Sequence, residues 1–138
     1  MSWITLALLS AASAAAVAIF GKIGINGIDS TLATSVRAVI MALFLVIVSL
    51  TLGKFDLLYT LNKKALIFIT FSGIAGALSW LFYFLALKKG PASGVAALDR
   101  LSVVFVLILA VLFLGEHLSW KSALGATLIS FGAILMSL

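Results

Sequence analysis

The chain is 138 residues long, with 64% hydrophobic residues, 9% charged residues and a formal net charge of +5. A mean hydropathy of +1.35 excludes a water-soluble globular protein, because most of the chain has no polar face to present to water. The positive charge could suggest nucleic acid, but the nine Lys and Arg stand singly or in pairs near the ends of apolar blocks. That spacing favours contact with lipid headgroups instead.

Five apolar blocks follow one another along the chain, each of about twenty residues and each long enough to cross a hydrocarbon layer of about 30 Å. We therefore expect helices over residues 3–21, 31–52, 65–87, 93–114 and 120–138. The first block lacks the basic start of a signal peptide, which favours a retained helix. The sequence predicts an all-α, polytopic membrane bundle in one domain, residues 1–138, that works inside the bilayer.

Residue types with metal or redox chemistry are scarce. There is no cysteine, so neither a disulfide nor a thiolate metal site can form. The single His, His117, has no second His or carboxylate at ligand spacing in its helix, so we expect no metal ion and no cofactor. The nearby Glu116 is more typical of a solvated helix end than of a functional carboxylate.

Several polar residues share one depth in the expected bundle. With five spans, the connections between the first and second helices and between the third and fourth lie on one surface, which we call side B; the opposite surface is side A. Arg37 and Asp99 lie about 10 Å below side B by the rise per residue, and Trp80 lies at a similar depth. Tyr83 is slightly nearer the surface. We expect Arg37, Asp99, Arg100, Trp80 and Tyr83 to form a protein-facing or water-facing cluster.

The charges in this layer need an explanation, since an isolated charge at that depth costs about 1–3 kcal/mol. Pairing Asp99 with Arg37 or another cation would offset part of the cost. Alternatively, the arginines extend to lipid headgroups, and Trp80 and Tyr83 belong to an interfacial aromatic belt. Asp99 is the best candidate for proton linkage, because a partly buried carboxylate holds a proton more readily than an exposed one.

Small residues recur at helical spacing on two of the expected helices, which lets another backbone approach closely. They predict helix-packing or dimer contacts, and they are Gly73, Gly76, Ser122, Ala126 and Ser130.

The lysines of the connections are almost evenly divided. Side A has four, and side B has three, or five charges if Arg37 and Arg100 are included. Positive charge thus gives little instruction about orientation. An odd number of spans makes successive repeats of a transporter inverted, and this chain carries one such unit. We therefore predict a homodimer, with the two copies in opposite orientations.

Three stretches resemble a known family: SVRAVIMALFL, SGIAGALSWLFYFLALKKGPAS and VFVLILAVLFLGEHLSWKSALGATLISFGAILM (Val104–Met136). Together they cover most of the chain. They resemble the EamA domain of the drug/metabolite transporter superfamily, in its single-domain, five-span branch. The resemblance implies a secondary transporter or exporter of small metabolites or drug-like solutes in the inner membrane of a prokaryote, acting by alternating access between inverted halves.

Two departures from related proteins limit what the resemblance implies. Many family members have Glu-Pro in the fourth helix, where this chain has Ser102 and Val103, so proline-assisted bending is not expected there. Ser102 joins the candidate substrate or coupling residues at that position. The related small multidrug resistance proteins use an acidic residue in the first helix, and here that helix has none. A non-transporting scaffold or accessory subunit is the alternative; no array of nucleophile, base and orienting group supports an enzyme.

Overall fold

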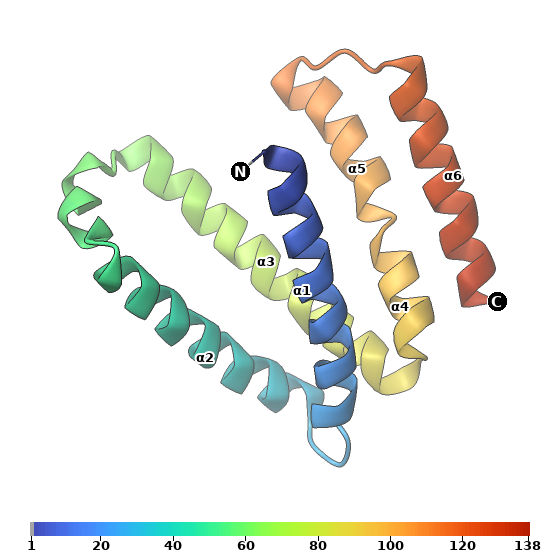
Figure 1. Cartoon of the computed structure of the whole chain (residues 1–138), viewed down its shortest axis with the longest axis horizontal. Helices are drawn as coiled ribbons and strands as arrows, with labels where there is room; N and C mark the ends of the chain where they lie inside the picture. Colours follow the sequence, from blue (N-terminus) through green and yellow to red (C-terminus); the bar gives the residue numbers. More distant parts are fainter. Residues whose placement is uncertain (1) are drawn as a thin grey trace. The chain divides into compact units, whose positions relative to one another are not determined.

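The computed structural model describes residues 2–138, and these residues form helices joined by short links (Figure 1). The elements are α1 (Trp3–Gly24), α2 (Ser30–Thr51), the 3₁₀ helix η1 (Lys54–Thr60), α3 (Lys63–Lys89), α4 (Ala92–Asp99), α5 (Ser102–Leu109), the π-helical segment η2 (Ala110–Leu114) and α6 (Trp120–Ser137). Five helical stretches are long and apolar enough to cross a membrane, with α4, α5 and η2 together making the fourth. The predicted all-α polytopic class is confirmed.

The chain divides into two compact units. Unit 1 comprises Met1–Ile23 and Lys89–Leu138, and unit 2 comprises Gly24–Lys88. In unit 2, α2 begins after Asp29, whose carboxylate accepts a hydrogen bond of 2.9 Å from the backbone N–H of Leu32. This N-cap satisfies one of the orphan N–H groups of the first turn.

The link between α2 and α3 also lies in unit 2. It is formed by the 3₁₀ helix η1, which begins after Gly53 in the left-handed conformation (φ 62°) and packs on α2. Asn62 then caps α3 by accepting a hydrogen bond of 2.8 Å from the N–H of Ala65. At the other end of α3, the ammonium group of Lys88 donates a hydrogen bond of 3.0 Å to the carbonyl oxygen of Ile28.

In unit 1, α4 packs on α6 through small residues. Gly94 and Ala97 of α4 are buried, as are Ala126 and Ala133 of α6. Short side chains let two helix backbones approach, and in lipid this close packing replaces the hydrophobic effect as a source of helix association. The ammonium group of Lys22, at the end of α1, donates a hydrogen bond of 2.7 Å to the carbonyl oxygen of Gly90 before α4.

The fourth span departs from the expected continuous helix over residues 93–114. It is interrupted at Arg100 and Leu101, where the N–H groups of Arg100, Leu101, Val103 and Val104 bond to carbonyls three residues back, as in a 3₁₀ turn. There is no proline or glycine at this point, so the usual helix breakers do not account for the interruption. The span then ends in the π-helical η2 and Gly115.

The spans leave most of their apolar surface uncovered. In the most apolar window of each span, no more than 6% of the residues are buried. A soluble monomer does not expose apolar surface on this scale, and a bilayer or a second chain provides the apolar surroundings that these helices need.

Candidate functional site

The guanidinium group of Arg37, in α2, lies over an aromatic ring of α3 in unit 2. The guanidinium carbon is 3.7 Å from the centroid of the Trp80 ring and 5.4 Å from that of the Phe84 ring. Both distances are within the range of a cation–π interaction, which contributes about 0.5–2 kcal/mol depending on how far the cation is removed from water. The structure thus brings together Arg37 and Trp80, two members of the expected cluster, and their role in binding stays a prediction.

Three rings of α3 form the aromatic side of this site. Trp80 and Tyr83 are 5.5 Å apart between ring centroids in an edge-to-face arrangement, and Trp80 and Phe84 are 6.1 Å apart in a similar one. The separation of Tyr83 and Phe84 is 6.3 Å. Spacings of three and four residues place side chains on one face of a helix, so the three rings support each other's orientation. Phe84 is buried, whereas Arg37, Trp80 and Tyr83 remain half-buried.

The depth of the guanidinium group follows from the helix bounds. Arg37 lies seven residues after the start of α2, and Trp80 lies nine residues before the end of α3. The rise per residue puts these Cα atoms about 10 Å and about 14 Å from those helix ends. A guanidinium group that stacks on the Trp80 and Phe84 rings is held at the level of those rings. The stack therefore argues against an Arg37 side chain fully extended to lipid headgroups.

The other predicted members of the polar cluster belong to unit 1. Asp99 is the last residue of α4, Ser102 is the first of α5, and Arg100 lies between them in the interruption of the fourth span. All three side chains are exposed. The predicted pairing of Asp99 with Arg37 joins residues of different units and stays a prediction.

The small-residue faces differ in what covers them. An added Cβ at Gly73 or Gly76 of α3 would meet nothing within 4 Å, so this glycine face is open. On α6, Ala126 is buried and Ser130 is half-buried, while Ser122 is exposed. Part of the α6 face is thus used for packing inside unit 1.

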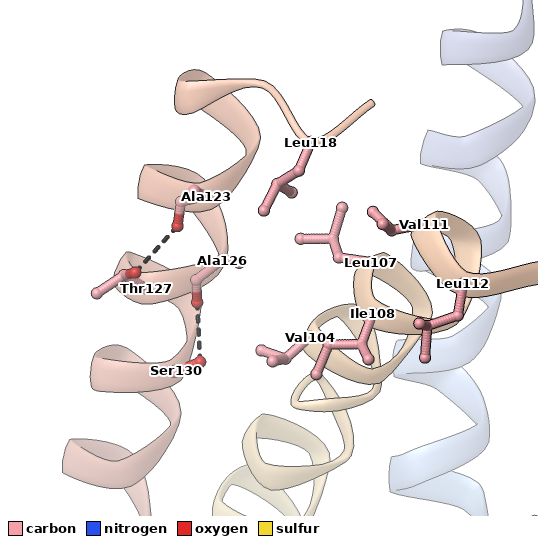
Figure 2. A pocket seen from close by; sticks show the side chains of 10 residues that line it. All are labelled: Val104, Leu107, Ile108, Val111, Leu112, Leu118, Ala123, Ala126, Thr127 and Ser130. Atoms are coloured by element: carbon pink, nitrogen blue, oxygen red, sulfur yellow. Dashed lines mark hydrogen bonds between the residues drawn. The ribbon is translucent and has the colours of Figure 1, made fainter. Parts of the chain in front are cut away.

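A second feature of unit 1 is an apolar cavity of about 430 Å³ between α5, η2 and α6 (Figure 2). Its two hydroxyl groups are already engaged. Thr127 donates a hydrogen bond of 2.9 Å to the carbonyl oxygen of Ala123, and Ser130 donates one of 2.8 Å to that of Ala126. The lining residues are Val104, Leu107, Ile108, Val111, Leu112, Leu118, Ala123, Ala126, Thr127 and Ser130.

Two features of the structure, the position of Phe84 and the apolar cavity, were not predicted from the sequence. Phe84 was not singled out, although its spacing of four residues from Trp80 could have placed it in the aromatic group. The cavity was missed because nothing in an uninterrupted apolar run distinguishes a cavity wall from a lipid-facing surface.

Five apolar helical stretches long enough to cross a membrane, with the Arg37 guanidinium group of α2 over an aromatic ring of α3, define the class of a multi-pass membrane protein. The chain matches the EamA-like transporter family over residues 1–138, and it belongs to that family. It is 42% identical over 136 residues to a protein of Sinorhizobium sp. described as "Uncharacterized transporter in cobO 3'region", covering 99% of this chain and 96% of the relative. No solved structure matches the chain. The comparisons confirm the resemblance drawn from the three sequence stretches.

Proposed function

We propose that the protein is a secondary transporter or exporter of small metabolites or drug-like solutes in the inner membrane of a prokaryote, and that it works by alternating access. Membership of a transporter family and the bacterial relative support the general class and the location. The single observation that carries the proposal is the half-buried Arg37 guanidinium on Trp80, since ionisable groups inside spans mark solute and ion pathways.

The working unit in this proposal is a homodimer with the two copies in opposite orientations. One copy supplies five spans, and an inverted second copy would supply the other half of an inverted-repeat transporter. The nearly even division of lysines between side A and side B supports insertion in both orientations. The open glycine face at Gly73 and Gly76 offers one surface on which a second copy could pack.

The interruption in the fourth span supplies a place for movement. Discontinuous helices recur at transporter sites because freed backbone groups and helix ends can then face a solute or an ion. Asp99 and Arg100 lie at this interruption, with Ser102 beginning the next helix. We assign Asp99 the role of the proton-linked group and the other two residues a supporting role in binding.

Reconstitution tests the proposal directly. Purified protein in proteoliposomes should give solute flux that rises in proportion to the protein-to-lipid ratio, whereas empty liposomes should not. A useful panel includes carboxylate, phosphate, neutral and cationic compounds of similar size. Absence of flux for all of them, with the protein folded and inserted, would contradict transport.

A non-transporting scaffold or accessory subunit is the second candidate, and the open glycine face of α3 favours it. In that case the face binds a helix of another protein, and Arg37 has only a packing role. Flux from the purified chain alone separates the two candidates, because a scaffold gives none.

A further inference from the structure

We propose that Arg37 binds an oxyanion, a carboxylate or phosphate group, of the solute that the protein carries. This inference rests on the proposed transport function and narrows it to anionic solutes. Arg37 supplies a planar fork of N–H donors, which fits both kinds of oxyanion through paired hydrogen bonds. Trp80 holds that fork in place from one face.

The contact with Trp80 does not use up the hydrogen-bonding capacity of the guanidinium group. A cation–π contact is an electrostatic attraction to the ring, so the planar set of N–H donors of Arg37 stays available for an oxyanion. Unit 2 contains two carboxylates, Asp29 and Asp56. The Asp29 carboxylate caps α2 at the N–H of Leu32, and Asp56 belongs to η1 at the opposite end of α2. Neither carboxylate of this unit neutralises Arg37.

With neither carboxylate of unit 2 on Arg37, its acceptor comes from outside this unit; pairing with Asp99 of unit 1, predicted from the sequence, is one outcome that the experiment below distinguishes. Two sources have the same chemistry: the phosphate of a lipid headgroup and the oxyanion of a solute. The ring stack holds the guanidinium group at the level of Trp80 and Phe84, back from the end of the helix where headgroup phosphates lie. The geometry therefore favours a solute that enters the bilayer-spanning region.

The surroundings of Arg37 also indicate what the rest of the solute is like. Trp80 is half-buried, so its ring keeps part of its surface accessible beside the guanidinium group, and Tyr83 packs on it with a centroid separation of 5.5 Å. Such rings bind apolar or aromatic groups well. The expected solute thus has an oxyanion at one end and an apolar or aromatic body.

A binding assay on the full-length protein tests this without requiring flux. The chain has three tryptophans, so the variant W3F/W120F leaves Trp80 as the only indole. The probes are benzoate, phenyl phosphate, benzyl alcohol and benzylamine. We expect saturable changes in Trp80 emission with benzoate or phenyl phosphate, and much weaker responses to benzyl alcohol and benzylamine. A preference for benzylamine would overturn the proposal.

Variants in the same background distinguish the contribution of the planar N–H donors of Arg37 from that of its positive charge. Arg37→Gln should weaken anion binding by about tenfold or more, since it removes a charge-assisted hydrogen-bonding group. Arg37→Lys keeps the charge but not the planar fork and should give an intermediate affinity. Lys54→Gln, in the exposed η1, is the matched control and should change nothing. Equal affinities for Arg37→Gln and the parent would contradict the role of Arg37; circular dichroism and size-exclusion chromatography verify folding.

Two further arms identify the source of the acceptor. Micelles of dodecyl maltoside, which contain no phosphate, should support benzoate binding as well as nanodiscs of phosphatidylglycerol; a Trp80 response to phosphatidylglycerol in place of the probes assigns the site to lipid and overturns the proposal. A response that appears only after Asp99→Asn also overturns it, because Arg37 is then neutralised by the chain itself. Benzoate binding without any flux leaves Arg37 as an anion-binding residue but contradicts transport. Flux with no preference for anions supports transport but overturns this inference.

Discussion

Gly94 of α4 lies against the last turn of α6, where a Cβ on this residue would be 3.3 Å from the carbonyl oxygen of Met136. The Cα of Ser137 would be 3.8 Å away. Backbone atoms cannot move aside as the end of a long side chain can, so larger residues at position 94 must push the two helices apart. Gly94 therefore sets how closely α4 and α6 pack.

We expect Gly94→Val to destabilise unit 1 by about 1–3 kcal/mol through overpacking. Gly94→Ala should cost less, because a shift of a few tenths of an ångström accommodates one methyl group. The matched control is Gly125→Ala in α6, where an added Cβ meets nothing within 4 Å and helix propensity improves. Unfolding of the micelle-bound protein by SDS measures the differences. A Gly94→Val variant as stable as Gly125→Ala would contradict the packing argument.

The contact between Arg37 and Trp80 should appear as a coupling energy. A double-mutant cycle with Arg37→Gln and Trp80→Leu is expected to give about 1–2 kcal/mol, because the two side chains stack inside the spanning region. The control cycle combines Arg37→Gln with Phe71→Leu, since Phe71 is exposed and lies more than two turns before Trp80 on α3. Its coupling should be within about 0.5 kcal/mol of zero. Equal coupling in the two cycles would show that the stack contributes nothing specific.

Length and apolarity were enough to predict the five spans, because a bilayer requires a minimum apolar helix length and satisfied backbone groups. The cap at Asp29 is likewise a local feature, since its carboxylate reaches an N–H only three residues away. The meeting of Arg37 with Trp80 followed from counting residues along two helices from the same side of the membrane. Each of these features depends on local sequence or on the fixed dimensions of the bilayer.

The interruption at Arg100 and Leu101 could not be predicted in the same way. No proline or glycine marks it, and although Asp99, Ser102 and Val103 are weaker helix formers than Ala or Leu, residues such as Ser and Val also lie within the continuous helices of this chain, so they do not predict a break. The approach of Gly94 to Met136 is equally invisible in sequence, because it depends on which face of α4 meets α6. Features that arise from tertiary packing, including the apolar cavity, cannot be predicted from the sequence and are visible only in the structure.

Neutralising Asp99 should remove proton coupling. In proteoliposomes we expect parent flux to change when a pH gradient is imposed, whereas flux through Asp99→Asn should be the same with and without the gradient, because the amide cannot exchange a proton. Asp56→Asn, in the exposed η1, is the matched control and should keep the parent response. A gradient response that survives in Asp99→Asn would contradict the coupling role, while leaving transport itself intact.

Removing the charge of a single lysine should change the fraction of chains inserted in each orientation. With five spans, the C-terminus lies on side B, and the positive-inside rule places the more positive side in the cytoplasm. Lys64→Gln removes a charge from side A and should raise the fraction of chains with a cytoplasmic C-terminus. Lys89→Gln removes one from side B and should lower that fraction. Paired reporters fused to the C-terminus, one active in the cytoplasm and one in the periplasm, measure both fractions.

The matched control for orientation is Asn26→Gln, which lies in the α1–α2 link and leaves the charge unchanged. The parent chain should give signal from both reporters, because the lysines of its two sides nearly balance. A parent chain inserted in one orientation only, and unmoved by either lysine variant, would contradict the antiparallel homodimer. Transport would then need a separate, oppositely oriented partner chain, since a single unit with an odd number of spans cannot supply its own inverted repeat.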